Sequence, residues 1–169
     1  MAKNPTAALV DSAQRRGYVG IGVYDSKYET NLGTLIRSAH AMGGTFVFTI
    51  GRRYESQPSA VGQDRHIPVF NFDSIESLST AMPAEADLVC VEIGHGSHVL
   101  PRFPHPERAV YLLGAEDYGL PESILSDHTV VEVPSEWPLN VATVGSIVLY
   151  DRLAKRIEAA CDGLEINSN

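Results

Sequence analysis

Four polar residues whose side chains could bind a ligand or take part in catalysis lie in or beside short loops rich in glycine and proline. Asn31 and Arg37 lie six positions apart in NLGTLIRSAHAMGG. Glu116 lies in LLGAEDYGLP, and Asn140 lies in VEVPSEWPLNVATVGSIVLYD. A carboxylate, two amides and a guanidinium can orient a ligand and stabilise charge that develops on it. Loops that follow strands also bring backbone N–H and C=O groups to the edge of a ligand, so these segments predict a shared pocket.

The segment 31–42 has apolar residues at helical spacing, and Asn31 is expected to be its N-cap. On such a helix Arg37 shares a face with small residues, among them Gly33 and Ala41, which lie four positions away. Small neighbours leave clearance around the guanidinium for a substrate or another backbone. The alternative is a surface arginine on an amphipathic helix.

The other two segments also have a functional and a structural interpretation. The segment 114–120 either brings backbone close to a ligand or is a tight turn in which Glu116 and Asp117 are solvated. Asn140 begins a long apolar helix. It either caps that helix and does nothing else, or it helps to direct the N–H groups of the helix start into the pocket.

Strand and helix signals alternate from one end of the chain to the other. Apolar and β-branched runs predict six strands, at 17–24, 45–50, 68–70, 86–93, 108–113 and 129–133. Helices are expected at 31–42, after an Asp73 cap, at 121–126 and at 140–160. This alternation predicts a mostly parallel sheet with helices on both faces, within a single domain over 1–169.

The composition is ordinary for a soluble globular protein, with 44% hydrophobic and 20% charged residues, and the chain is expected to be cytoplasmic. No apolar run approaches the roughly 20 residues of a membrane span. The two cysteines, Cys90 and Cys161, suggest a reducing compartment. Three loop histidines, His95, His98 and His105, lack the ligand set of a zinc site, so no metal is expected. A dinucleotide-binding glycine fingerprint is also absent from the sequence, which disfavours a nucleotide-dependent oxidoreductase.

A net charge of −8 argues against nucleic-acid binding, for which basic patches are the usual sign. The best local candidates for phosphate contact are Arg52 and Arg53, because they follow a strand and open a long polar loop. The alternative is that they are solvated surface charges. Other basic clusters are Arg15-Arg16 and the group Arg152, Lys155 and Arg156.

In order and spacing, the three motifs resemble those of the TrmH/SpoU family of S-adenosylmethionine-dependent RNA 2′-O-methyltransferases, in the SPOUT superfamily. The G-x-E-x-x-G-L pattern of the family is complete over 114–120. The resemblance implies a deep trefoil knot, although topology rules alone favour an open sheet. It also implies a homodimer and an RNA substrate, for which tRNA is expected. The apolar residues of the helix 140–160 are compatible with a dimer face.

The resemblance further implies which residues form the site. Catalytic roles fall on Arg37, Asn31, Glu116 and Asn140. S-Adenosylmethionine is expected to bind, mainly through backbone contacts, at Glu92, Ile93, Gly94, Leu113, Gly114, Gly119, Val133 and Leu139. One departure is Pro138, which stands where the family has a small, often hydroxyl-bearing residue and which cannot donate a hydrogen bond. This departure and the acidic charge keep a second hypothesis open, a non-catalytic RNA-binding or assembly factor on the same fold.

The sequence leaves the proton acceptor open. Family schemes give Arg37 the role of base towards the ribose hydroxyl, but a guanidinium stays protonated in proteins. In a milder scheme, Arg37 holds the adjacent phosphate and polarises the hydroxyl. Glu116 then orients the arginine or accepts the proton.

Overall fold

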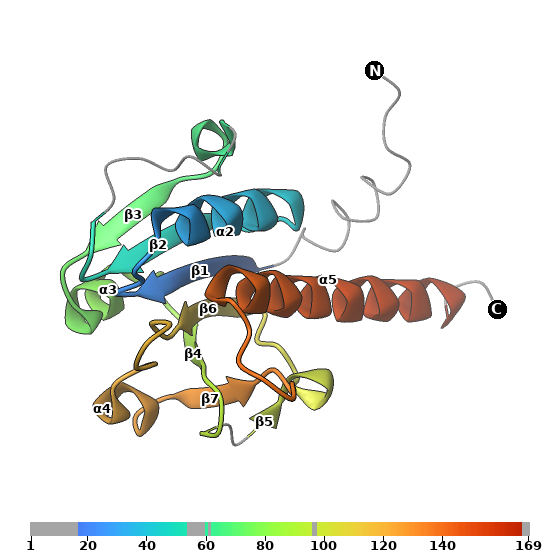
Figure 1. Cartoon of the computed structure of the whole chain (residues 1–169). Coiled ribbons are helices and arrows are strands. Elements are labelled where there is room, and N and C mark those ends of the chain that lie inside the picture. The colour runs from blue at the N-terminus through green and yellow to red at the C-terminus, as the bar shows by residue number, and fades with distance from the viewer. Residues whose placement is uncertain (1–16, 54–59, 61, 96–97, 167–169) are drawn as a thin grey trace.

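The structure is a computed structural model that describes residues 17–53, 60, 62–95 and 98–166 (Figure 1). Its strands are β1 (Tyr18–Tyr24), β2 (Phe46–Ile50), β3 (Val69–Phe72), β4 (Asp87–Val91), β5 (His98–Val99), β6 (Arg108–Leu113) and β7 (Thr129–Glu132). Its α-helices are α2 (Glu29–Ala41), α3 (Ile75–Ala81), α4 (Glu122–Leu125) and α5 (Val141–Ile166). Two 3₁₀ helices, η2 (Gln63–Arg65) and η3 (Leu100–Arg102), complete the described elements.

The strands form one seven-stranded parallel sheet in the order β3-β2-β1-β6-β4-β7-β5. The prediction of a mostly parallel sheet is therefore confirmed, and the six predicted strands correspond to six of the seven. The additional strand, β5, lies in a segment that was expected to be a loop. It has only two residues, which pair with Val131 and Glu132 of β7. Two residues are too few to show an alternating pattern in a sequence.

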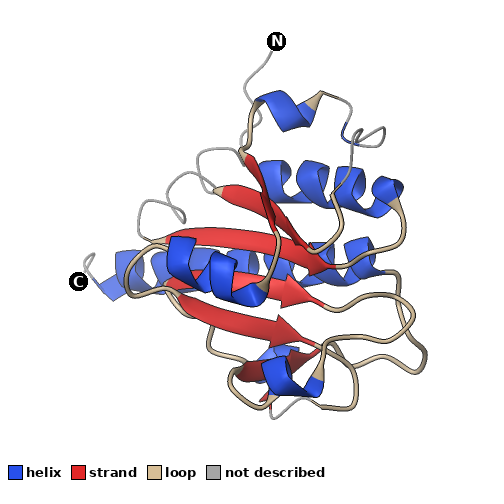
Figure 2. Cartoon of the chain, turned by 90° about the vertical axis from the view of Figure 1, so that its left-hand side faces the viewer, coloured by secondary structure: helices blue, strands red, loops and turns tan. Residues whose placement is uncertain are grey.

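Helices cover both faces of the sheet and enclose a separate core on each side (Figure 2). The central strand β6 shows why, because successive side chains of a strand point to opposite faces. Ala109, Tyr111 and Leu113 pack in the core with α2 and α5. Val110 and Leu112 pack in the other core with α3 and α4. Burial on both faces explains why this strand reads as a continuous apolar run.

Helices α2 and α5 lie against each other and run in the same direction (Figure 1). The hydroxyl oxygens of Ser38 and Ser146 are 2.7 Å apart. A Cβ atom at Gly145 would lie 2.5 Å from Cδ1 of Leu35, so the missing side chain allows this close approach. The packing places the first turns of both helices at the edge of the sheet where the strands end. The threading of α5 through a loop, implied by the resemblance, stays a prediction.

Two predicted helix caps are wrong. Helix α2 begins at Glu29 with Tyr28 in the cap position, so Asn31 lies in the first turn and is only 7% exposed. Its amide is engaged by residues far away in the sequence. Helix α3 is capped by Ser74 instead of Asp73. Ser74 and Ser77 form a reciprocal capping box, which satisfies two backbone N–H groups at once.

A buried polar network anchors α5 to the segment before β6. The two ring nitrogens of His105 contact the hydroxyl of Tyr111 (2.5 Å) and Oδ2 of Asp151 (2.7 Å). Lys155 donates to the same Asp151 oxygen (2.6 Å) and to the carbonyl of Leu100 (2.7 Å). Because an ionised carboxylate only accepts, Nε2 of His105 donates to Asp151, and Nδ1 accepts from Tyr111 when the ring is neutral. His105, expected as a loop histidine, thus has a structural role, and its side chain is only 4% exposed.

Stability should fall as the pH drops below about 6.5, the usual pKa of histidine. Burial lowers the pKa of His105, and the nearby Asp151 offsets this only in part. The unfolded chain therefore takes up a proton at a higher pH than the folded chain, and protonation favours unfolding between the two pKa values. Urea unfolding measures the free energy of unfolding at pH 7.5 and at pH 5.5. This free energy should decrease less between the two pH values for His105→Gln than for the wild type. The same pH dependence in both proteins would contradict this explanation, and His98→Gln, at an exposed histidine, is the control.

No helix of the described residues has both the length and the apolar character needed to cross a membrane.

Candidate functional site

A cavity of about 430 Å³ opens at the edge of the sheet where β4, β6 and β7 end. The loops after these strands and the start of α5 form its walls. Nine of the predicted site residues line it: Glu92, Ile93, Leu113, Gly114, Glu116, Gly119, Val133, Leu139 and Asn140. Gly94, Asn31 and Arg37 are not among the lining residues. The structure therefore gathers segments that are almost 50 residues apart in sequence around one space.

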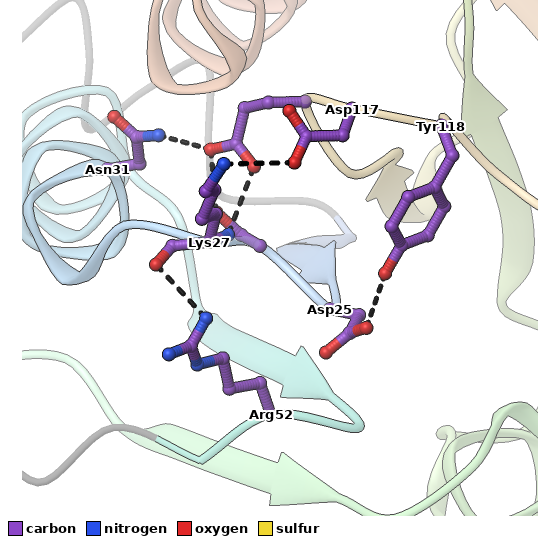
Figure 3. A network of polar contacts seen from close by, with 8 residues as sticks. Asp25, Lys27, Asn31, Arg52, Asp117 and Tyr118 are labelled. Carbon is purple, nitrogen blue, oxygen red and sulfur yellow. Dashed lines mark hydrogen bonds and ion pairs between the residues drawn. The ribbon is translucent and has the colours of Figure 1, made fainter.

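Three predicted catalytic residues form one hydrogen-bonded chain at the wall of this cavity. The Asn31 amide donates to Oε1 of Glu116 (Figure 3). Asn140 donates to Oδ1 of Asn31 over 2.9 Å. Oδ1 of Asn140 accepts the backbone N–H groups of Ala142 (2.9 Å) and Thr143 (3.3 Å). Asn140 therefore caps α5, as the structural interpretation expected, and also connects that cap to Glu116 through Asn31.

The carboxylate of Glu116 is held in its ionised form. Desolvation, the largest effect, raises its pKa, but hydrogen bonds to the charged form outweigh this and lower the pKa overall. The donors are the backbone N–H of Lys27 (3.1 Å), the hydroxyl of Ser26 (2.8 Å) and the amide of Asn31. A carboxylate with a lowered pKa and occupied oxygens is a weak base. Glu116 is thus better suited to fixing the wall of the site than to accepting a proton.

Glu92 fills the space that two glycines leave open. Its Oε2 accepts the backbone N–H of Leu120 (2.8 Å), and its Oε1 lies 3.1 Å from the N–H of Ile93. A Cβ atom at Gly119 would lie 2.5 Å from the same Oε2, and Gly119 has a φ of +66°. A Cβ at Gly114 would lie 2.8 Å from the backbone of Gly119. The Glu92 side chain therefore clamps the loop 114–120 against the end of β4.

The chain matches the family model of the SpoU rRNA Methylase family over residues 19–150. This chain belongs to the SpoU rRNA methylase family. The match covers all three motifs, and it confirms the resemblance to TrmH/SpoU proteins. Among curated proteins, none matches the sequence.

Solved structures of SpoU proteins share this fold. The A. aeolicus TrmH/SpoU tRNA modifying enzyme has a TM-score of 0.76 at 16% identity, over 91% of this chain and 83% of that one. AviRb from Streptomyces viridochromogenes, solved with AdoMet, has a TM-score of 0.73 at 24% identity, over 85% of this chain and 59% of that one. A structure that concerns the 2-OH methylation of C/U34 on tRNA has a TM-score of 0.73 at 23% identity, over 80% of this chain and 94% of that one. This chain thus spans little more than half of the AviRb chain.

Arg37, the central residue of the first SpoU motif, projects from the outer side of α2. Arg37, Thr34 and Ala41 are all exposed, as a shared open face requires, whereas Gly33 is buried. Within the described ranges, no hydrogen bond or ion pair joins the Arg37 guanidinium to Glu116 or to another residue. Arg37 is therefore available to a ligand outside the fold, and Glu116 does not orient it directly.

The basic residues proposed for RNA contact have different surroundings. Arg52 donates to the carbonyl of Lys27 (3.2 Å), and among the described residues it has no acidic partner (Figure 3). Arg53 is exposed and paired with Asp73 at 2.9 Å. The expectation of a surface cluster near the C-terminus is wrong for Arg152, which is 4% exposed and donates to the carbonyl of Glu107 (2.7 Å). Arg15 and Arg16 lie outside the described residues.

The loop between β1 and α2 also contacts the second motif, although no sequence motif marks this loop. Besides the contacts to Glu116, Lys27 pairs with Asp117 at 3.2 Å, and the hydroxyl of Tyr118 donates to Asp25 (Figure 3). Three consecutive residues of the second motif thus bind three consecutive residues of this loop. The available signal was that 25–27 follows the end of a predicted strand. That signal places the loop 25–27 in the site only when it is known that β1 lies beside β6 in the sheet.

Pro138 lines the cavity but has no N–H group to offer there. Ser135 lines the same cavity and carries a hydroxyl. A hydroxyl donor is therefore present three residues before the position where the family usually has one. Within the described ranges, no group of three or more His, Cys, Asp or Glu side chains is arranged to hold a metal ion.

Proposed function

We propose that this chain is an S-adenosylmethionine-dependent RNA ribose 2′-O-methyltransferase that acts on tRNA. The observation that carries the proposal is the cavity bounded by the Gly114–Gly119 loop and by Asn140, whose side chain is linked to Glu116 through Asn31. Family membership and the AdoMet complex of AviRb support the choice of cofactor. Two similar structures concern tRNA and support it as a substrate, while a structure with a TM-score equal to one of these is an rRNA methyltransferase from Sinorhizobium meliloti.

The cavity suits the proposed cofactor in size and in chemistry. A volume of about 430 Å³ lies in the range of small-molecule sites. Ile93, Leu113, Val133 and Leu139 supply apolar walls for an adenine ring, and the loop around Gly114 supplies backbone groups. When bound, S-adenosylmethionine supplies an activated methyl group on a sulfonium.

The residues of this chain position the acceptor ribose and stabilise the charge that develops on its 2′-oxygen. A guanidinium is a fixed cation with a planar fork of donors, which suits Arg37 to hold the phosphate next to the acceptor ribose and to polarise the 2′-hydroxyl, as in the milder of the two schemes. The hydrogen bonds that link Glu116, Asn31 and Asn140 fix the position of the second motif relative to the third. Placing the reacting atoms in line provides most of the rate in such a transfer. The oxygens of Glu116 already accept hydrogen bonds from Ser26, Lys27 and Asn31, so the hydroxyl proton leaves to the solvent as the methyl group is transferred.

Calorimetry with S-adenosylmethionine tests the proposal against the non-catalytic hypothesis. The proposal predicts one binding site per chain, which a Gly114→Val variant lacks. A non-catalytic factor with a closed cofactor loop would bind none. Wild-type protein that is folded and binds no cofactor would refute the proposal.

The active form is proposed to be a cytoplasmic homodimer that associates through α5. Some apolar residues of this helix, among them Val148 and Leu149, are already buried within the chain itself. Ile147 (36% exposed) and Tyr150 (64% exposed) lie three positions apart and remain open to a second copy. A partner would also give the exposed Arg37 a neighbouring cavity to face. Sedimentation velocity should show a dimer that Tyr150→Asp dissociates, and a wild-type monomer at all concentrations would contradict this arrangement.

RNA affinity should depend on salt through the loop after β2. Each phosphate neutralised by a cation contributes about 0.7 to 0.9 to the log–log slope of affinity against salt. Changing Arg52 and Arg53 together to alanine should flatten this slope by about one to two and weaken binding to all sequences. Arg108→Ala, at the opposite end of the strands, is the control and should leave the slope unchanged. An unchanged slope in the double variant would show that this loop does not touch RNA.

A further inference from the structure

Trp137 is the only tryptophan of the chain, and it is 74% exposed. It lies in the loop between β7 and α5, between Ser135 and Pro138, both of which line the cavity. Trp137 itself is not a lining residue, so its ring faces solvent at the rim. In the described part of the chain, the indole has no hydrogen-bond partner and no ring stacked on it. A tryptophan this exposed beside a functional cavity marks a contact surface.

The loop presents the indole from a fixed position. Val133, before the loop, is buried in the core, and Asn140, after it, is tied to Asn31 and to the first turn of α5. Pro134 and Pro138 restrict the backbone on either side of Trp137. A ring that is held in place before binding loses little conformational entropy when a partner stacks on it.

Charge alone gives this chain little attraction for RNA. The net charge is −8, and two cations at the same edge of the sheet, Lys27 and Arg53, are already paired with Asp117 and Asp73. A contact that does not depend on charge is therefore needed for affinity. Stacking between an aromatic side chain and a nucleobase is such a contact, and it is available only when the base is unpaired.

We propose that Trp137 stacks on an unpaired nucleobase of the RNA substrate, at or next to the nucleotide whose ribose enters the cavity. This inference rests on the proposed function and narrows its substrate to looped or single-stranded RNA. Paired bases hide their faces inside the helix, so a duplex offers no partner for the indole. Trp137 is thus a substrate-positioning residue that selects unpaired nucleotides.

The intrinsic fluorescence of the full-length protein tests this directly, because a single tryptophan gives the whole tryptophan signal. A single-stranded RNA of about 12 nucleotides should quench the emission, and the same strand in a duplex should leave it nearly unchanged. Anisotropy of the labelled strand should show binding weakened about 5- to 100-fold by Trp137→Ala. Trp137→Phe, which keeps a ring, should retain most of the affinity. Phe70→Ala is the control, since it removes a ring of 48% exposure on the far edge strand β3.

The results separate this inference from the proposed function. The stacking would be overturned, and the activity left standing, in either of two cases. In the first, the wild type transfers methyl groups but RNA does not quench its tryptophan fluorescence. In the second, the wild type is active but Trp137→Ala binds RNA as tightly as the wild type does. Quenching without cofactor binding would support the stacking and refute the methyltransferase. A blue-shifted emission of the free protein that moves to the red on dilution would show that a second copy covers the indole, and would overturn the inference.

Discussion

Replacing Arg37 with alanine is expected to slow methyl transfer by about 100-fold or more, in line with the loss of one group that stabilises developing charge. Folding and cofactor binding should be unaffected. Arg37 is exposed on α2, and within the described ranges it has no bonded partner whose loss would destabilise the chain. Substitutions at such positions change stability by about 0.5 kcal/mol or less. The loss should therefore appear in turnover and not in the melting temperature.

The matched variants are Arg37→Lys and Thr34→Ala. Lysine keeps the positive charge but lacks the planar fork that binds a phosphate through two hydrogen bonds, so it should recover only part of the rate. Thr34 is exposed on the same face, and among the described residues its hydroxyl bonds only to the carbonyl of Thr30 within the helix, so its loss should be neutral. Single-turnover assays with saturating cofactor provide the measurement. Undiminished transfer by Arg37→Ala would remove this residue from the mechanism.

Changing Gly114 to valine should abolish the binding of S-adenosylmethionine. A side chain at this position would collide with the carboxylate of Glu92 and would come within 2.8 Å of the Gly119 backbone. Backbone cannot move aside as cheaply as the end of a side chain, so the loop 114–120 would be displaced from the cavity wall. Calorimetry should detect no binding to this variant, while circular dichroism should still show a folded protein.

Gly62→Ala is the control for the effect of adding a side chain to a glycine. Gly62 has a φ of +77° and no heavy atom within 4 Å of its expected Cβ, so this variant has backbone strain without a collision. It should bind the cofactor as the wild type does. Wild-type affinity in Gly114→Val would show that the loop 114–120 is not part of the cofactor site.

Local patterns predicted the strands well because both faces of the sheet are buried. In β6, apolar residues at every position after Arg108 made the strand visible without knowledge of its neighbours. The caps were less predictable. Asn31 has the residue type and position of an N-cap, but Glu116 and Asn140, 85 and 109 residues away, bind its amide. Ser74 replaced Asp73 because Ser77 makes a reciprocal pair possible.

The candidate site was predictable in content and less so in arrangement. The family resemblance implied nine of the lining residues, and all but Glu92 and Ile93 lie in the motifs, which mark loops that end parallel strands at one edge. Ser26 and Lys27 had no motif of their own, and their role depends on the sheet order that places β1 next to β6. His105 likewise has its structural role only through Asp151, 46 positions later. Long-range pairing of this kind has no local signature.

Mass spectrometry of nucleosides is the most direct test of the central claim, methyl transfer to a ribose 2′-hydroxyl of tRNA. Unmodified tRNA transcripts would be incubated with the wild type and with Arg37→Ala in the presence of S-adenosylmethionine carrying a labelled methyl group, and then digested to nucleosides. The account predicts that the wild type produces one labelled 2′-O-methylnucleoside and that Arg37→Ala produces almost none. A label on a base, or no label on tRNA from wild-type protein that binds the cofactor, would contradict it.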